Sequence, residues 1–353
     1  MRRLPIYFLV DVSESMVGTP IEQVQDGIAT IINELRTDPY ALETAWVSVI
    51  AFAGKAKMLS PLQELYKFYP PKFPVGGGTS LGSALNFLMD ELDISLQKTT
   101  ADLKGDWKPI IFLFTDGNPT DSVDKAFERW NNKYRCRSNL IVVSIGDNVN
   151  TQLMGCISNN VLRLKETDAN SFKDFFKWVT ASIKTTSVSV ADAGEDDLKL
   201  APINGIKLEK VDAEKSCVVD ENFVVLNARC QTTHQPYLIK FAKRLQKSEM
   251  MSGLFELPQF VTSYKLVGAY PISHVGYKEL SETVARQQKI NTQELIGQPT
   301  CPCCGNQFGM VICECGNVFC VGEDANSKCP WCGLEGELTS VSSGGLDINR
   351  ARG

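Results

Sequence analysis

The chain has 353 residues, 43% of them hydrophobic, and a formal net charge of −5. This length allows two or three domains with a sizeable core, and the mildly acidic balance gives no electrostatic reason to expect a nucleic acid or an anionic membrane as a partner. No apolar run approaches the length of a membrane span, so we expect a cytoplasmic protein. Metal binding rather than disulfide formation is indicated, because eight of the twelve cysteines crowd between Cys301 and Cys332.

Residues 1–186 predict one α/β domain, in which short apolar runs alternate with amphipathic patterns. After a first strand that ends at Val10, strands are expected at 45–52, 110–114, 140–146 and 161–164, with an edge partner at 57–65. Helices are expected at 20–35, 81–92, 123–134 and 171–183. The alternation predicts a doubly wound, mostly parallel sheet with both faces covered. Ligands of such sheets bind at the carboxyl ends of the strands.

Oxygen-bearing side chains occur at three places that we expect to lie at the carboxyl edge of this sheet. Asp11 follows the first strand, and Ser13 and Ser15 come at alternate positions, so all three can project to one side. Thr79 lies in a glycine-rich loop, and Asp116 ends a central strand. Two carboxylates and three hydroxyls suit a six-coordinate hard cation with room for water. The pattern therefore predicts Mg²⁺, or else Mn²⁺ or Ca²⁺, at this edge.

This combination resembles the von Willebrand factor A domain, a Rossmann-like fold with a metal-ion-dependent adhesion site of pattern D-x-S-x-S, a distant Thr and a distant Asp. The matching residues are Asp11-Val12-Ser13-Glu14-Ser15, Thr79 in Gly78-Thr79-Ser80, and Asp116 in Phe114-Thr115-Asp116-Gly117. The resemblance covers roughly residues 4–186. It implies that Ser13 and Ser15 bind the ion directly. Thr79, Asp11 and Asp116 would bind it directly or through water, according to conformation.

Hydroxyls outnumber carboxylates in this set, so the ion is expected to accept an acidic residue of a partner protein. The alternative is Mg²⁺-dependent phosphotransfer with Asp11 as the nucleophile. Phosphatases of the haloacid dehalogenase type need a second carboxylate where this chain has Ser13, so we expect recognition and no enzyme activity. Three further carboxylates near this edge, Glu14, Asp121 and Asp147, are expected to be solvated rather than ligating.

Two further segments follow the α/β domain. Residues 187–204 are small and acidic, which is typical of a linker, and alternating runs within 205–296 predict a small β-rich domain. Among the cysteines outside the C-terminal cluster, Cys136 and Cys156 are expected to pack in the first domain. Cys217, Cys230 and His234 are too loosely spaced to favour a metal site, the alternative for these three, so we expect packing or surface roles for them in the second domain.

Two copies of Cys-Pro-x-Cys-Gly within 297–336 predict a zinc-ribbon-like module. Each copy forms a tight turn that aims two thiolates at one ion, and together they supply Cys301, Cys304, Cys329 and Cys332. A second zinc site would use Cys303, Cys313, Cys315 and Cys320. Cys303 is otherwise a free thiol, and Cys313 and Cys315 fit either pair, so one or two zinc ions are expected. The tail at 337–353, rich in Ser and Gly, is predicted to be disordered.

The whole arrangement is similar to the TerY-like proteins of bacterial tellurite-resistance and stress clusters, which end in a TerY-C zinc-binding domain. The segments Gln298-Pro299-Thr300-Cys301-Pro302-Cys303-Cys304-Gly305-Asn306-Gln307 and Cys329-Pro330-Trp331-Cys332-Gly333 carry this likeness. The resemblance implies a scaffold or switch in a phosphorylation system, with a protein kinase and a type 2C phosphatase as partners. A zinc-ribbon adaptor for nucleic acid is a further alternative, disfavoured by the few basic residues of the module.

Overall fold

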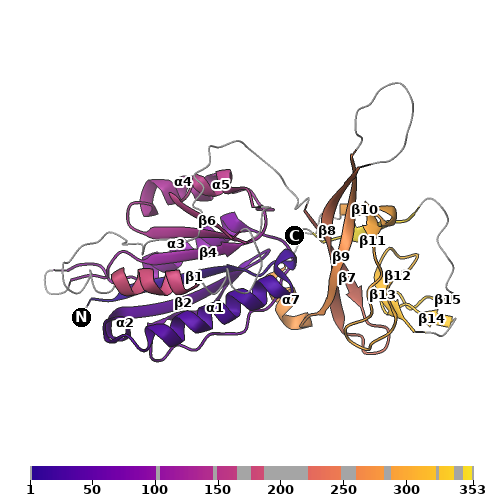
Figure 1. The fold of residues 1–353 in the computed structure, drawn as a ribbon, viewed down its shortest axis with the longest axis horizontal. Coiled ribbons are helices and arrows are strands. Elements are labelled where there is room, and N and C mark those ends of the chain that lie inside the picture. The colour runs from indigo at the N-terminus through magenta and orange to yellow at the C-terminus, as the bar shows by residue number, and fades with distance from the viewer. Residues whose placement is uncertain are drawn as a thin grey trace, which may run out of the picture.

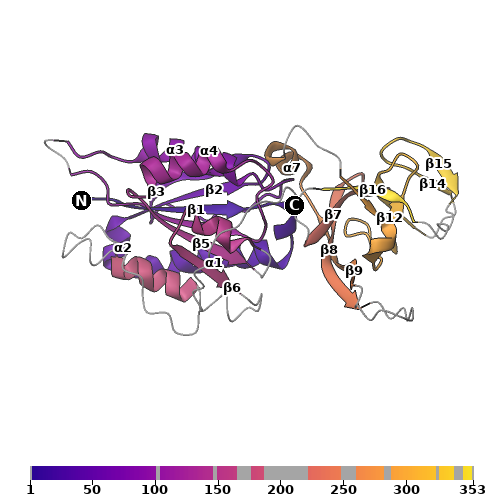
Figure 2. The same ribbon diagram turned by 90° about the horizontal axis from the view of Figure 1, so that it is seen from above.

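The computed structural model describes residues 2–100, 104–145, 149–164, 176–186, 222–247, 260–281, 288–322, 326–337 and 345–351. They form an α/β region and, beside it, a β-rich region (Figures 1 and 2). The predicted linker at 187–204 lies outside the described residues. Of the helices in the described part of the chain, none combines the length and the apolar character that crossing a membrane requires.

A six-stranded sheet forms the centre of the α/β region, in the order β3-β2-β1-β4-β5-β6. Its strands are β1 Leu4–Asp11, β2 Ala45–Phe52, β3 Ala56–Glu64, β4 Ile110–Thr115, β5 Asn139–Ile145 and β6 Asn160–Leu164. Neighbouring strands are parallel, except that β3 runs antiparallel to β2 at the edge. The predicted doubly wound fold is confirmed. The strand order reverses between β1 and β4, which makes their carboxyl ends the switch point for ligands.

Helices cover both faces of this sheet (Figure 2). Phe8 and Val10 of β1 belong to the core on the α1 side, whereas Tyr7 and Leu9 belong to the core on the α3 side, as period-two alternation requires. The helical segments are η1 Glu14–Met16 (3-10), α1 Thr19–Leu35, α2 Pro39–Thr44, α3 Leu81–Ser95, α4 Asp124–Arg129, η2 Trp130–Tyr134 (a π-helical turn), α5 Thr151–Gly155 and a helix over 176–186. The helix predicted at 123–134 is thus α4 continued by η2.

A second six-stranded sheet forms the β-rich region, in the order β11-β9-β8-β7-β13-β12. Its strands are β7 Phe223–Arg229, β8 Pro236–Lys247, β9 Phe260–Pro271, β11 Leu295–Ile296, β12 Phe308–Ile312 and β13 Val318–Val321. Two antiparallel pairs accompany it, β10 Gln288–Asn291 with β16 Asp347–Arg350 and β14 Asn326–Lys328 with β15 Glu335–Glu337. The remaining elements are the helix α7 His274–Leu280 and the 3-10 turn η3 Thr292–Glu294.

This second sheet corrects two predicted divisions of the chain. β13 pairs in parallel with β7, so the segments 205–296 and 297–336 share one sheet and are not separate units. Within the tail, β16 is ordered because it pairs with β10, and Ile348 lies opposite Ile290. Both predictions failed for one reason: the pairing partners lie far apart in sequence and leave no local pattern.

Candidate metal sites

The first candidate site lies at the switch point between β1 and β4. Asp11, the last residue of β1, accepts hydrogen bonds from the backbone N–H of Ser13 at 2.9 Å and from the hydroxyl of Thr115 at 2.7 Å. The Ser13 and Ser15 hydroxyls lie 2.9 Å apart, and the Ser15 hydroxyl donates to Asp116 at 2.8 Å. Four of the five predicted magnesium ligands therefore belong to one network of oxygen atoms that joins the ends of two strands.

Thr79, the fifth predicted ligand, comes from the glycine-rich loop before α3. Its backbone N–H donates to the Thr120 hydroxyl at 2.9 Å, and its carbonyl accepts from the Thr120 N–H at 2.8 Å. The loop is also bonded to the turn after β1, because the Gly76 N–H donates to the Val12 carbonyl at 2.9 Å. Gly78 has a φ of +87°, a conformation that favours glycine. The loop is therefore fixed to both segments that carry the other four side chains.

All five side chains are almost completely buried. The exposed fraction is 0% for Asp11, Ser13 and Ser15, 2% for Thr79 and 3% for Asp116. The two buried carboxylates and the three hydroxyls are hard oxygen donors, and a divalent cation would offset the cost of burying the charges. The donor set thus fits Mg²⁺, Mn²⁺ or Ca²⁺.

Of the carboxylates predicted to be solvated, Glu14 is buried and Asp121 is half-buried. Glu14 is fully buried and accepts a hydrogen bond from the Tyr277 hydroxyl of α7. Burial raises the pKa of Tyr277, and the nearby negative charge of Glu14 raises it further. Asp121 accepts hydrogen bonds from two backbone N–H groups in the first turn of α3, at 3.1 and 2.9 Å, and so acts as a helix cap. Asp147 lies outside the described residues.

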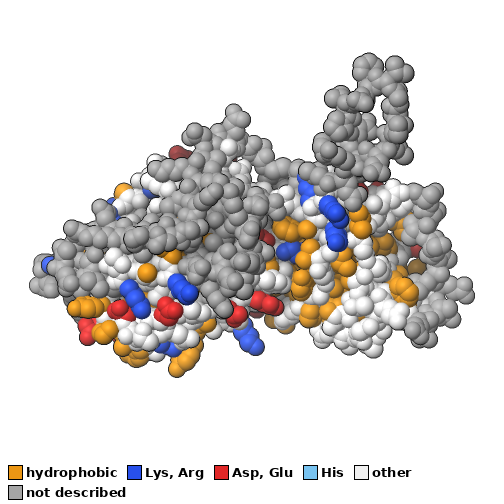
Figure 3. All heavy atoms as spheres, in the orientation of Figure 1, with side chains coloured by type: hydrophobic (Ala, Val, Ile, Leu, Met, Phe, Trp, Pro, Cys, Tyr) orange, Lys and Arg blue, Asp and Glu red, His pale blue; other side chains and the backbone are white. Residues whose placement is uncertain are grey.

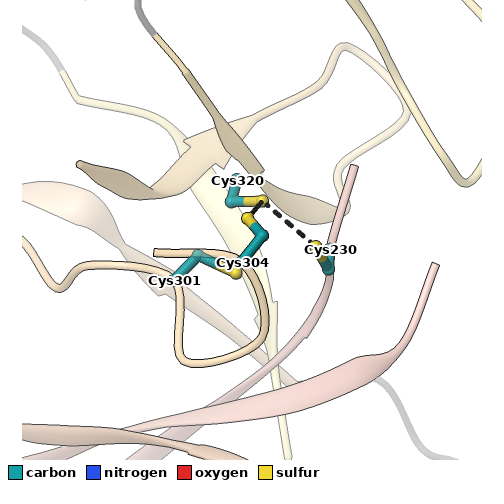
Figure 4. Close-up of side chains that lie close together, drawn as sticks. All are labelled: Cys230, Cys301, Cys304 and Cys320. Carbon is teal, nitrogen blue, oxygen red and sulfur yellow. Dashed lines mark hydrogen bonds between the residues drawn. The ribbon is translucent and has the colours of Figure 1, made fainter. Parts of the chain in front are cut away.

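Two clusters of four cysteines form the other candidate sites. The first contains Cys230, Cys301, Cys304 and Cys320, whose side chains converge in Figure 4, and the second contains Cys313, Cys315, Cys329 and Cys332. Hydrogen-bonded sulfur pairs within the clusters lie 3.5 to 3.9 Å apart. Thiolates at about 2.3 Å from a tetrahedral zinc ion lie about 3.8 Å from one another. Both clusters therefore have the geometry of a structural zinc site.

This grouping corrects the predicted ligand sets. The prediction placed Cys301 and Cys304 with Cys329 and Cys332, but each Cys-Pro-x-Cys-Gly turn belongs to a different cluster. Cys303 belongs to neither cluster, whereas Cys230, for which we expected a packing or surface role, supplies the fourth sulfur of the first cluster. Sequence reasoning missed Cys230 because no second cysteine lies beside it at the spacing of a knuckle. Cys136 and Cys156 are exposed rather than packed in the core.

Hydrogen bonds adjust the acidity of the cysteine thiols. Burial raises the pKa of Cys320 to about 11. At Cys230, burial is outweighed by hydrogen bonds, chiefly from Thr233, and the pKa falls to about 7. At Cys315, burial is likewise outweighed by hydrogen bonds from Asn317, which lower the pKa to about 7. One thiol in each cluster is thus readily converted to the thiolate, which is the form that binds a metal.

Comparison with known protein families accounts for both regions. Residues 6–178 match the von Willebrand factor type A domain, and residues 220–353 match the TerY-C metal binding domain. The chain contains a von Willebrand factor type A domain followed by a TerY-C metal binding domain. The predicted family likeness is confirmed, and both cysteine clusters, Cys230 included, fall within the TerY-C domain.

Several solved structures also resemble this chain at low sequence identity. A von Willebrand factor type A protein from Catenulispora acidiphila is 15% identical, with a TM-score of 0.40 over 52% of this chain and 43% of that one. The pilus adhesin SpaC from Lactobacillus rhamnosus GG is 14% identical, with a TM-score of 0.42 over 53% and 31%. Proximal thread matrix protein 1 from the mussel byssus, with a zinc-occupied MIDAS motif, is 15% identical, with a TM-score of 0.37 over 53% and 46%. This chain covers less than half of each of these proteins.

Proposed function

We propose that the chain is a divalent-metal-dependent protein-interaction module. Its A domain holds Mg²⁺, or Mn²⁺ or Ca²⁺ in its place, through Asp11, Ser13, Ser15, Thr79 and Asp116, and the ion binds an acidic residue of a partner protein. Two zinc ions, one in each cysteine cluster, hold the TerY-C domain in its fold. The proposed setting is a bacterial tellurite-resistance or stress-response phosphorylation system, with a kinase and a type 2C phosphatase as partners.

The oxygen network between β1 and β4 is the observation that carries this proposal. Its hydroxyls are neutral ligands, so an ion bound there keeps a positive potential that attracts a further carboxylate. The same geometry disfavours phosphotransfer by Asp11. Both oxygens of Asp11 accept hydrogen bonds, one from Ser13 and one from Thr115, and these bonds stabilise the carboxylate and weaken it as a nucleophile.

Metal titration of single-residue variants tests the site. We expect Asp11→Ala and Thr79→Ala to weaken Mn²⁺ binding, measured by electron paramagnetic resonance, by about ten-fold or more because each loses an oxygen ligand. Asp26→Ala, which changes an exposed aspartate on α1, is the matched control and should bind Mn²⁺ as the parent chain does. Equal Mn²⁺ affinity in all four proteins would contradict the assignment of the site.

Partner capture tests the function itself. The immobilised chain should retain a purified kinase or type 2C phosphatase of the same gene cluster in Mg²⁺ and release it in a chelator, and Asp11→Ala should retain neither. Capture that is indifferent to the chelator would contradict the proposal. Asp11-dependent hydrolysis of p-nitrophenyl phosphate or a phosphopeptide would instead favour the enzyme alternative. Lysine and arginine side chains make no continuous stripe on the described part of the face in Figure 3, so binding of nucleic acid has no electrostatic support there.

A further inference from the structure

The TerY-C domain lies directly on the turn that carries the two serine ligands. Lys240 of β8 is only 3% exposed, and its ammonium group donates a hydrogen bond to the carbonyl of Ser15. Tyr277 of α7 donates to Glu14 and accepts from the side-chain amide of Asn227 on β7 at 3.1 Å. The turn η1 is therefore bonded to two elements of the other domain, by contacts that span 225 and 263 residues of sequence.

An apolar cluster surrounds these polar contacts. It joins residues of the A domain to residues of the TerY-C domain: Val17 and Val75 from the first, and Val225, Leu238, Tyr270, Ile272, Tyr277 and Ala351 from the second. A glycine permits a close approach here, because a Cβ atom at Gly18 would lie 2.8 Å from the ring of Tyr270. The two domains thus share a packed interface beside the oxygen site.

Helix α7 also contacts the loop that carries Thr79, and it lies between the two regions in Figures 1 and 2. Leu280 is 1% exposed and belongs to the core of the A domain. A Cβ atom at Gly76 would lie 2.6 Å from the Cβ of Leu280, so the glycine makes room for this side chain. Ser281 accepts a hydrogen bond from the Gly77 N–H at 2.9 Å. The TerY-C domain therefore contacts both the turn after β1, which carries Ser13 and Ser15, and the loop that carries Thr79.

We propose that the TerY-C domain closes the metal site in cis. Lys240 and Tyr277 cover the approach to the ion, and an acidic segment of a partner binds only after this domain moves away. This inference rests on the proposed function, because it names what controls access to the same ion. Interfaces between domains of one chain resemble transient protein–protein interfaces, so an opening motion is physically reasonable. The acidic segment of the partner and the TerY-C domain would then compete for the same position over the metal site.

An exposed ion pair across the interface reports the closed state. Lys57 of β3 and Glu279 of α7 form this pair and are 48% and 50% exposed. Treatment of the chain with a carbodiimide cross-links this pair. The reagent activates the Glu279 carboxylate, and the Lys57 amine attacks the activated carboxylate to form an amide. The carbodiimide takes up the water that is removed and leaves as a urea. Lys133 and Asp93, 2.6 Å apart and 47% and 42% exposed within the A domain, form the control cross-link.

The opening variant is Lys240→Met combined with Tyr277→Phe, which removes the two polar contacts and nearly keeps the shapes of the side chains. We expect the Lys57–Glu279 cross-link in the full, zinc-loaded chain to fall by about ten-fold or more relative to the control, because two charge-assisted hydrogen bonds to the A domain are lost. Mn²⁺ bound to this variant should also relax water protons more strongly than Mn²⁺ bound to the parent chain, because water reaches the ion. Leu280→Ala is a second opening variant and should act in the same direction.

Two results would overturn closure in cis. One is an unchanged cross-link ratio in whichever of these variants folds, and the other is a lost cross-link without a gain in water relaxation, which would mean that the docked domain does not control the ion. Failure of the proposed function is a different result, namely Mn²⁺ binding by Asp11→Ala that equals that of the parent chain. The two failures are therefore distinguishable, because the cross-link reports domain docking and the Mn²⁺ titration reports the ligands.

Discussion

Replacing Cys230 by serine tests whether the end of β7 completes the first zinc cluster. Cys230 is fully buried, and its Sγ lies 3.8 Å from that of Cys320. Structural zinc contributes about 10–16 kcal/mol of apparent binding free energy, so an equal division over four thiolates assigns about 2.5–4 kcal/mol to each. At about 1.4 kcal/mol for each factor of ten, the loss of this thiolate should weaken zinc binding at the first cluster by about 60- to 700-fold.

The assay compares Cys230→Ser with Cys303→Ser. Native mass spectrometry should count two zinc ions in the parent chain, and a competing chromophoric chelator should remove the first-cluster ion from Cys230→Ser at far lower concentration. Cys303 is the matched control because it adjoins the ligand Cys304 but belongs to neither cluster, so Cys303→Ser should keep both ions. The reasoning is refuted if Cys230→Ser holds two ions as firmly as the parent chain, or if Cys303→Ser loses one.

Three further predictions concern stability. Leu280→Ala should lower the free energy of unfolding of the docked chain by about 2–5 kcal/mol, because it leaves a cavity at a buried position in the A-domain core. Urea titration measures this free energy, and Leu280→Met should lower it far less because the side-chain volume is nearly kept. Burial raises the pKa of Tyr7 from 10.0 to about 12. The protonated phenol therefore contributes its full share of the folding stability below pH 10, and about 3 kcal/mol of stability should be lost as the pH rises from 10 through 12. Tyr7→Phe should remove that loss, and an unchanged pH dependence of the unfolding free energy would contradict it. Asp121→Ala should destabilise the chain by about 1 kcal/mol through the lost cap of α3, measured by thermal unfolding. Asp26→Ala, at an exposed position in the interior of α1, should not.

Much of the A domain and of its oxygen site is predictable from local sequence. Asp11 and Asp116 each follow an apolar run directly, and a parallel sheet brings the ends of such strands to one edge. The glycines before Thr79 mark a turn that side chains would obstruct. Four of the five residues of this site therefore lie within a few positions of a strand end, and the fifth, Thr79, follows a run of glycines.

The TerY-C domain is less predictable because its decisive contacts join distant segments. Cys230 and Cys320 are 90 residues apart, and Glu14 and Tyr277 are 263 residues apart. A lone cysteine without knuckle spacing looks like a packing residue, and a glutamate in a turn looks solvated. No period or spacing within a single sequence encodes either contact, since each exists only once the second sheet has formed.

Strand β7 runs between the oxygen site and the first cysteine cluster. Its Val225 belongs to the apolar cluster beside the oxygen site, and Cys230, the residue after its end, belongs to the first cysteine cluster. Extended chain places these two positions about 16 Å apart. A hard ion held by oxygens and a soft ion held by thiolates would thus act on the same short strand. A shift of β7 at the first cysteine cluster would therefore reach the apolar cluster beside the oxygen site through only five residues of extended chain.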